Sequence, residues 1–122
     1  MTKKLESRVA IVTGSARGLG VALAEQFAAD GASILLVDKS GEALADVARR
    51  AREWGSPEVA HTAQEPATEQ GAAEVIALAL RTWGKIDILV NNAGGGLIRP
   101  PRAESMASRR ALRLNLSDRA LP

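Results

Sequence analysis

One short segment, Thr13 to Gly20, constrains the fold of this chain more than any other; it reads Thr-Gly-Ser-Ala-Arg-Gly-Leu-Gly. It follows a continuously apolar run, residues 9–12, and opens a stretch of helical periodicity. Gly14 permits a tight turn, while Gly18 and Gly20 let the backbone approach a bound group with no Cβ in the way. A helix N-terminus at this turn would attract phosphate through its free N–H groups and positive partial charge. The segment therefore predicts a nicotinamide-dinucleotide site; a glycine-rich turn that binds nothing is the alternative.

Apolar runs alternate with helical patterns along the first ninety residues. The runs are mostly continuous rather than alternating, as expected of strands that are covered on both faces. They are residues 9–12, 34–37, a weaker run around 58–61, and 86–90. Each helical pattern between them ends at a glycine, the residue preferred after a helix C-terminus. The order predicts an α/β fold, a Rossmann-type doubly wound parallel sheet of about four strands.

The chain changes character after residue 98. Residues 99–122 contain six arginines and three prolines, and one helix is expected there, over about 104–116. We therefore divide the chain into an NAD-binding Rossmann half-domain, residues 1–98, and an arginine-rich tail, residues 99–122. A truncated chain and a reading frame shifted near Pro100 would each explain such a tail. The sheet would then stop after about the fourth strand, whose edge would be open to another chain.

The cofactor is predicted from the acid that follows the second apolar run. Asp38 lies 18 residues after Gly20, close to the ~20-residue spacing at which an acid holds the ribose hydroxyls of adenosine. Its carboxylate would repel a 2′-phosphate, which favours NAD over NADP. Arg17 and Lys39 favour the opposite choice, because either cation could pair with that phosphate.

The segment Asn91-Asn92-Ala93-Gly94 leaves the fourth apolar run. Together with the glycine turn and Asp38, it resembles the short-chain dehydrogenase/reductase family, over about residues 5–98. The spacing of Gly84 and Asp87 ahead of Asn91 is similar to that family's pattern as well. The resemblance implies that Asn91, Ala93 and Gly94 stabilise the central sheet and line the adenosine-ribose side of the cofactor.

The same resemblance places adenine recognition after the third strand, where the family usually has an Asp-Val pair. Here those positions hold Glu65 and Pro66. Glu65 can keep the acceptor role, whereas Pro66 has no N–H to donate. The predicted cofactor-binding residues are Gly14, Ser15, Arg17, Gly18, Leu19, Gly20, Asp38, Glu65, Asn91, Ala93 and Gly94.

Catalysis in this family uses an Asn-Ser-Tyr-Lys set, in which the tyrosine exchanges a proton with the carbonyl or alcohol. The 122 residues contain no tyrosine, and no lysine lies where the family's lysine is expected. Asn115 resembles the catalytic asparagine at the bend of the family's fourth helix; an ordinary polar helix position is the alternative. The resemblance thus implies the cofactor-binding portion of an NAD-dependent alcohol or ketone oxidoreductase, inactive as this chain.

Composition narrows the remaining function classes. The chain is 46% hydrophobic with a net charge of +2, which permits a core and gives no footprint for nucleic acid. The absence of cysteine excludes a disulfide scaffold and thiolate-bound metal, and no metal site is expected. No apolar run approaches the about 18 residues of a membrane-spanning helix, so we expect a cytoplasmic protein.

A second function stays open beside the first. The free edge of the fourth strand would let the chain act as a non-catalytic interaction module. Its partner would be a second copy of the chain or a full-length relative.

Overall fold

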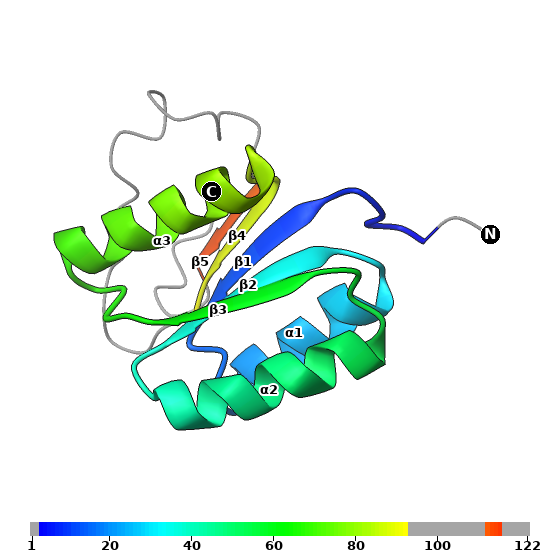
Figure 1. Ribbon diagram of the computed structural model, residues 1–122, viewed down its shortest axis with the longest axis horizontal. Coiled ribbons are helices and arrows are strands. Elements are labelled where there is room, and N and C mark those ends of the chain that lie inside the picture. Colours follow the sequence, from blue (N-terminus) through cyan, green and yellow to red (C-terminus); the bar gives the residue numbers. More distant parts are fainter. Residues whose placement is uncertain (1–2, 93–111, 116–122) are drawn as a thin grey trace.

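The protein is described by a computed structural model that covers residues 3–92 and 112–115, the latter as backbone only. Within these residues five strands form one parallel sheet, and three helices cover its two faces (Figure 1). In chain order the elements are β1 (Val9–Thr13), α1 (Leu19–Ala29), β2 (Ser33–Asp38), α2 (Gly41–Trp54), β3 (Val59–Ala63), α3 (Glu69–Trp83), β4 (Ile88–Asn91) and β5 (Leu112–Asn115). The predicted α/β, doubly wound architecture is confirmed.

The strands lie in the order β3-β2-β1-β4-β5, and every neighbouring pair is parallel. Strands β2 and β3 therefore lie on one side of β1, and β4 and β5 lie on its other side. The strand order reverses between β1 and β4, at the carboxyl ends of these two strands. Ligands of doubly wound proteins bind at such a point.

The helices divide between the two faces of the sheet: α1 and α2 cover one face, and α3 covers the other (Figure 1). Alternate residues of each central strand supply the two hydrophobic clusters, which explains why these strands are apolar without interruption. In β1, Ala10 and Val12 pack toward α1 and α2, whereas Ile11 packs toward α3. All three are fully buried.

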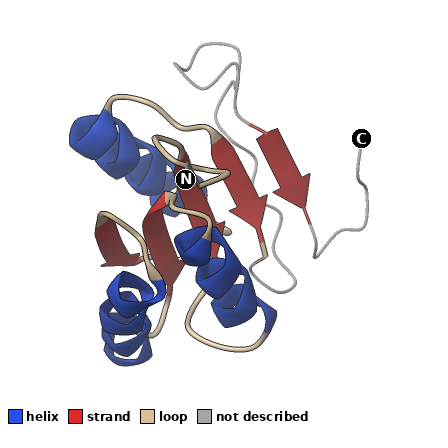
Figure 2. Cartoon of the chain, turned by 90° about the vertical axis from the view of Figure 1, so that its right-hand side faces the viewer, coloured by secondary structure: helices blue, strands red, loops and turns tan. Residues whose placement is uncertain are grey.

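A fifth strand, β5, lies beyond the four that the sequence predicts, at the outer edge of the described sheet (Figure 2). It pairs with β4 from Ile88 opposite Leu112 to Asn91 opposite Asn115. The expected helix over 104–116 is therefore wrong at 112–115; residues 104–111 and 116 lie outside the described ranges. The predicted free edge of the fourth strand is wrong as well, because β5 occupies it. The alternation Leu-Arg-Leu-Asn has the period of a strand, and pairing with β4 outweighs the poor helical stripe.

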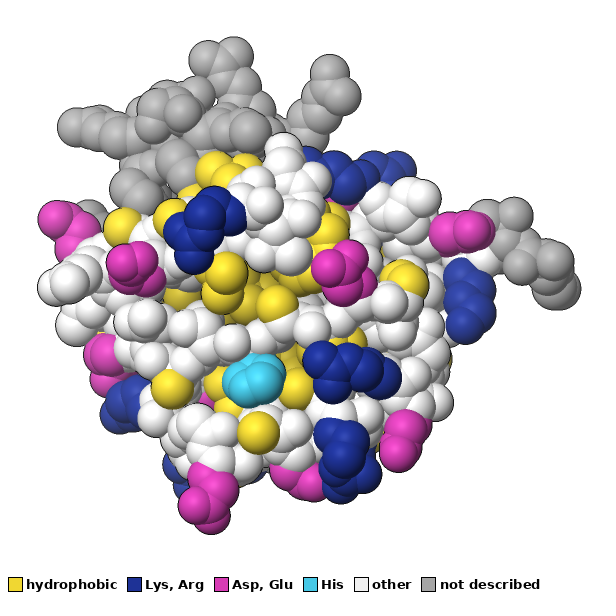
Figure 3. Space-filling view, in the orientation of Figure 1, with side chains coloured by type: hydrophobic (Ala, Val, Ile, Leu, Met, Phe, Trp, Pro, Cys, Tyr) yellow, Lys and Arg dark blue, Asp and Glu magenta, His cyan; other side chains and the backbone are white. Residues whose placement is uncertain are grey.

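The opposite edge of the sheet is β3, which the prediction placed around 58–61 and the structure places at Val59–Ala63. Figure 3 shows hydrophobic side chains at the surface between this strand and α3, with the single histidine, His61, exposed beside them. Partly buried residues close the cluster on this face. They are Ala60, Leu78, Leu80 and Trp83.

The amino ends of the strands are joined by Asp87, just ahead of β4. Its carboxylate accepts a hydrogen bond from the N–H of Val9 at 2.8 Å and pairs with Lys85 at 3.2 Å and Arg8 at 3.5 Å. Lys85 also donates to the carbonyl oxygen of Ser7. Partial burial alone would raise the pKa of Asp87, but the Val9 N–H and the two cations together lower it below its ordinary value. Asp87 therefore ties the start of β4 to the start of β1, at the amino edge of the sheet.

Candidate functional site

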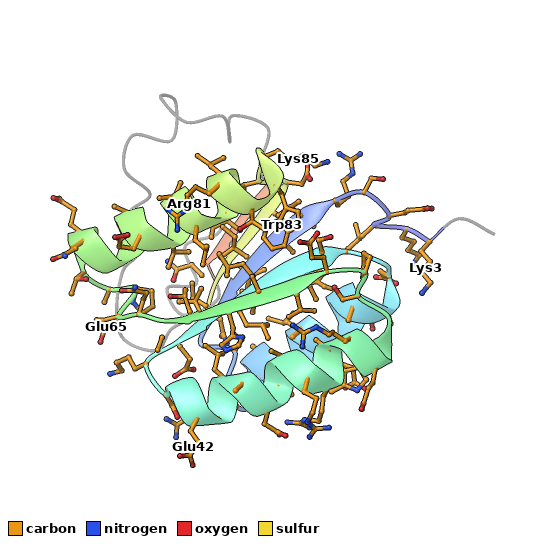
Figure 4. All side chains as sticks on the ribbon, viewed as in Figure 1. Lys3, Glu42, Glu65, Arg81, Trp83 and Lys85 are labelled. Atoms are coloured by element: carbon orange, nitrogen blue, oxygen red, sulfur yellow. The ribbon has the colours of Figure 1, made fainter. Side chains whose placement is uncertain are left out.

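Most of the residues that the sequence singled out meet at the carboxyl edge of the sheet. The glycine turn follows β1, Asp38 ends β2, Glu65 follows β3 and Asn91 ends β4. Figure 4 shows this edge at the end of the molecule marked by Glu42 and Glu65, with Lys3 and Lys85 at the opposite end. Four separate segments of the sequence thus converge on the carboxyl edge of the sheet, beside the strand-order reversal.

The glycines of the turn are required by its geometry. Gly18 has φ +60°, a backbone conformation that residues with a side chain rarely adopt. A Cβ on Gly20 would stand 1.9 Å from the carbonyl oxygen of Gly14, far inside contact distance. The turn and the first turn of α1 therefore pack backbone against backbone, which brings the helix N-terminus to the sheet edge.

No side chain caps that N-terminus with a hydrogen bond in the described residues. Gly18 is the N-cap of α1, and the first turn of the helix holds no acidic residue. In α3, by contrast, the Thr68 hydroxyl accepts the N–H of Gly71 at 2.9 Å, and Glu69 lies in the first turn. The N-terminus of α1 is therefore the one of these two that offers N–H groups and positive partial charge to a bound anion.

Leu19 borders this N-terminus and is 55% exposed, the one large hydrophobic residue that is exposed in the described part of the chain. An apolar surface is therefore exposed beside the N-terminus of α1. Arg17 is exposed in the same turn. Both predicted residues are thus exposed at the glycine turn.

Ser15 lies behind the turn rather than on its surface. Its hydroxyl is fully buried, donates to the carbonyl oxygen of Val37 at 3.3 Å and accepts the N–H of Val37 at 3.0 Å. The Ser15 N–H donates to the same carbonyl oxygen at 3.2 Å. Ser15 therefore fastens the glycine turn to β2, and we assign its side chain a structural contribution to the predicted binding set.

Asp38 also holds the turn. One carboxylate oxygen accepts the N–H of Ala16 at 3.1 Å, and the other accepts the N–H of Ser40 at 3.1 Å. Each oxygen keeps a second lone pair that can accept from a ribose hydroxyl. The half-buried carboxylate thus lies between the turn and the start of α2, where the sequence predicted a ribose contact.

Glu65 and Lys39 form an ion pair with 3.3 Å between Nζ and Oε2. The other Glu65 oxygen accepts the N–H of Ala67 at 3.2 Å. The carboxylate predicted to read adenine is therefore already bound on both oxygens. Sequence reasoning missed this pair, because only the pairing of β2 with β3 brings the two residues, 26 positions apart in the sequence, to neighbouring strand ends.

Asn91 is buried at the end of β4, and its neighbour Asn92 donates its N–H to the Thr13 hydroxyl at 2.8 Å. The same hydroxyl donates to the carbonyl oxygen of Val90 at 3.3 Å. Thr13, which the sequence suggested only as the start of the turn, thus joins β1 to β4 at the carboxyl edge of the sheet. Ala93 and Gly94 lie outside the described residues.

Asn115 lies on β5, directly opposite Asn91 in the parallel register. The sequence predicted it at a helix bend, and the strand assignment corrects that. Its backbone lies beside that of Asn91 at the carboxyl edge of the sheet. Its predicted catalytic role stays a prediction.

Neither a metal site nor a membrane-spanning helix is present in residues 3–92 and 112–115. No group of three or more histidine, cysteine or acidic side chains there can hold a metal ion. No helix of these ranges is long and apolar enough to cross a membrane.

Known proteins with a similar sequence were found in three comparisons. The sequence model of the family described as short chain dehydrogenase matches residues 8–117. The chain is 34% identical over 113 residues to 7alpha-hydroxysteroid dehydrogenase of Escherichia coli strain K12, covering 93% of this chain and 44% of that protein. It is 40% identical over 93 residues to an uncharacterized oxidoreductase of Mycobacterium tuberculosis, covering 75% and 35%. The chain thus spans less than half the length of these curated relatives.

Solved structures show the same likeness. L-sorbose reductase from Gluconobacter frateurii, complexed with NADPH and L-sorbose, superposes with a TM-score of 0.73 at 39% identity, over 80% of this chain and 37% of that one. NAD⁺-bound xylitol dehydrogenase superposes with a TM-score of 0.71 at 35% identity, over 75% and 35%. Both nicotinamide dinucleotides therefore occur in similar structures.

Proposed function

Since the chain belongs to the short chain dehydrogenase family, we propose that its carboxyl edge binds a nicotinamide dinucleotide, with NAD(H) preferred over NADP(H). The observation that carries the proposal is the uncapped N-terminus of α1 beneath the glycine turn. It supplies N–H groups to the pyrophosphate. Gly14, Gly18 and Gly20 form the cradle, Leu19 borders it, and Asp38 accepts from the ribose hydroxyls.

The preference for NAD(H) rests on charge at the end of β2. Asp38 would repel a 2′-phosphate, and Lys39, the adjacent cation, is paired with Glu65. Arg17, exposed in the turn, is the cation that favours NADP(H). Similar structures carry either dinucleotide, so the choice depends on these local charges.

The reaction proposed for the whole protein is hydride transfer between the nicotinamide and an alcohol or ketone, by analogy with its relatives. Hydride addition to a carbonyl creates an alkoxide that must receive a proton in place. The 122 residues hold no tyrosine for this step. We therefore propose that this chain binds the cofactor and does not turn over substrate, with Asn115 the one member of the catalytic set that it retains.

The experiment is a titration with NADH that follows energy transfer from Trp54 and Trp83, the two tryptophans of the chain. Circular dichroism in the same samples reports whether the protein is folded. We expect a saturable signal and no oxidation of NADH when simple ketones are added. A folded sample without a saturable response contradicts the proposed site, and steady turnover contradicts the proposed inactivity.

A second candidate function is association through the sheet edge. Within the described ranges β5 has β4 as its single neighbour, so its outer backbone groups have no strand partner there, and a second copy could pair with them. Light scattering during size-exclusion chromatography distinguishes the two states. A dimer whose population rises with protein concentration favours association, and a monomer at every concentration rejects it.

A further inference from the structure

The ion pair between Lys39 and Glu65 lies across the part of the edge where the adenosine ribose is proposed to bind. Lys39 directly follows Asp38 at the end of β2, and Glu65 follows β3, the neighbouring strand. The pair is 72% and 40% exposed, and pairs so exposed contribute little to stability. What the pair does change is the charge that this edge offers to a ligand.

Lys39 is the cation nearest in sequence to the acid that is proposed to meet the ribose hydroxyls. With Asp38 and Glu65 it forms a group of two carboxylates and one ammonium, which carries a net charge of −1. A 2′-phosphate approaching this group must compete with Glu65 for the ammonium. A ribose with a free 2′-hydroxyl has no such competition, because it needs only an acceptor from Asp38.

We propose that Glu65 is a specificity-determining residue, which holds Lys39 in an ion pair and thereby favours NAD(H) over NADP(H). The inference rests on the dinucleotide site proposed above. In this proposal Glu65 acts through Lys39, and its predicted contact with adenine stays a separate prediction. The Ala67 N–H, which binds the other Glu65 oxygen, keeps the carboxylate fixed at the end of β3.

The substitution Glu65→Gln isolates the charge. A glutamine can still accept the Ala67 N–H through its amide oxygen, so the turn before α3 keeps its hydrogen bond. Lys39 loses its anionic partner, and the group of three becomes neutral. We expect the ratio of the dissociation constants, NADPH over NADH, to fall about three- to tenfold, as for one exposed charge near a phosphate.

The test measures both dissociation constants from the fluorescence anisotropy of the reduced nicotinamide, in the unsubstituted protein, Glu65→Gln, Lys39→Gln and the double variant. The gain in NADPH binding should vanish in the double variant, which should match Lys39→Gln. The gain in NADPH binding of Glu65→Gln should also shrink as salt is added, because the charges are exposed.

The matched control is Glu53→Gln, which breaks the 3.6 Å ion pair with Arg49 near the other end of α2. That helix of 14 residues is about 20 Å long, so the control makes the same charge change away from the site and should leave the ratio unchanged. An unchanged ratio in Glu65→Gln, or a gain that persists in the double variant, overturns the inference while the dinucleotide site stands. Failure of the folded, unsubstituted protein to bind either dinucleotide overturns the proposed function and the inference with it.

Discussion

Gly20 shows how one atom decides whether the turn can form. A Cβ there would meet the carbonyl oxygen of Gly14 at 1.9 Å, and backbone on both sides leaves no flexible group to move aside. We predict that Gly20→Ala lowers the free energy of unfolding by about 3 kcal/mol or more, the upper end for overpacked sites. Urea denaturation followed by circular dichroism measures it.

Gly41→Ala is the matched control for that substitution. A Cβ at Gly41, the first residue of α2, would lie 3.4 Å from the Cβ of Ala63, an ordinary contact. The free energy of unfolding of the Gly41→Ala variant should stay close to that of the unsubstituted protein. Equal losses in the two variants would show that the close approach at Gly20 is not the cause.

Asp87 makes a prediction about pH. Its pKa is lowered in the folded protein from the ordinary 3.8, so its contribution is fully present above that value and is lost as the pH falls through the folded pKa. We predict that Asp87→Asn lowers the free energy of unfolding by about 1–2 kcal/mol at neutral pH, the range for a hydrogen bond to a charged group.

The difference between the two proteins should narrow as the pH falls below about 3.8, where the carboxylate of the unfolded chain takes up a proton first, and should be lost as the pH falls through the lower folded pKa. Urea denaturation of both proteins at neutral pH and at about pH 3 measures the two gaps. A gap that stays the same size at both values would mean that the charge of Asp87 does not stabilise the fold.

At the scale of elements, α1 differs from α3 in having no cap and no acid in its first turn. Leu19→Asp would place a carboxylate there, on a residue that is 55% exposed. We predict a gain in the free energy of unfolding of about 0.5 kcal/mol from the helix dipole. The affinity for NADH should fall about tenfold or more, because the carboxylate repels the pyrophosphate and occupies its N–H groups.

Leu19→Asn serves as the control, because the asparagine side chain has nearly the same shape as aspartate and carries no charge. It should lose much less affinity than Leu19→Asp when both are titrated with NADH. Equal losses would indicate that the apolar side chain, and not the charge at the helix N-terminus, governs binding.

The elements also show which parts of the structure local pattern can predict. The runs that became β1 and β2 are apolar without interruption because both faces of the sheet are covered, and this made them recognisable. The prediction was wrong at residues 112–115, because their two leucines fit a poor helical stripe as well as a strand. The strand forms through its pairing with β4, a long-range contact that local pattern does not reveal. The predicted range of β3 differed from the observed one because β3 lies at an edge of the sheet, where exposed positions weaken the apolar pattern.

At the scale of the whole molecule, topology decides what the site contains. The glycine turn and Asp38 were predictable because both belong to one strand-helix-strand unit. The contacts of Ser15 with Val37 and of Lys39 with Glu65 were not, because they depend on which strands become neighbours. The division at residues 98 and 99 and the preference for NAD(H) stay predictions.

The most direct test of the dinucleotide site is a titration of ¹⁵N-labelled protein with NADH, followed by the positions of its backbone amide resonances. The proposed site predicts saturable shifts at Gly14, Gly18, Leu19 and Gly20, with Lys85 and Asp87 at the opposite edge unchanged. Shifts centred on that opposite edge, or no saturable shift at the glycine turn of the folded protein, would contradict it.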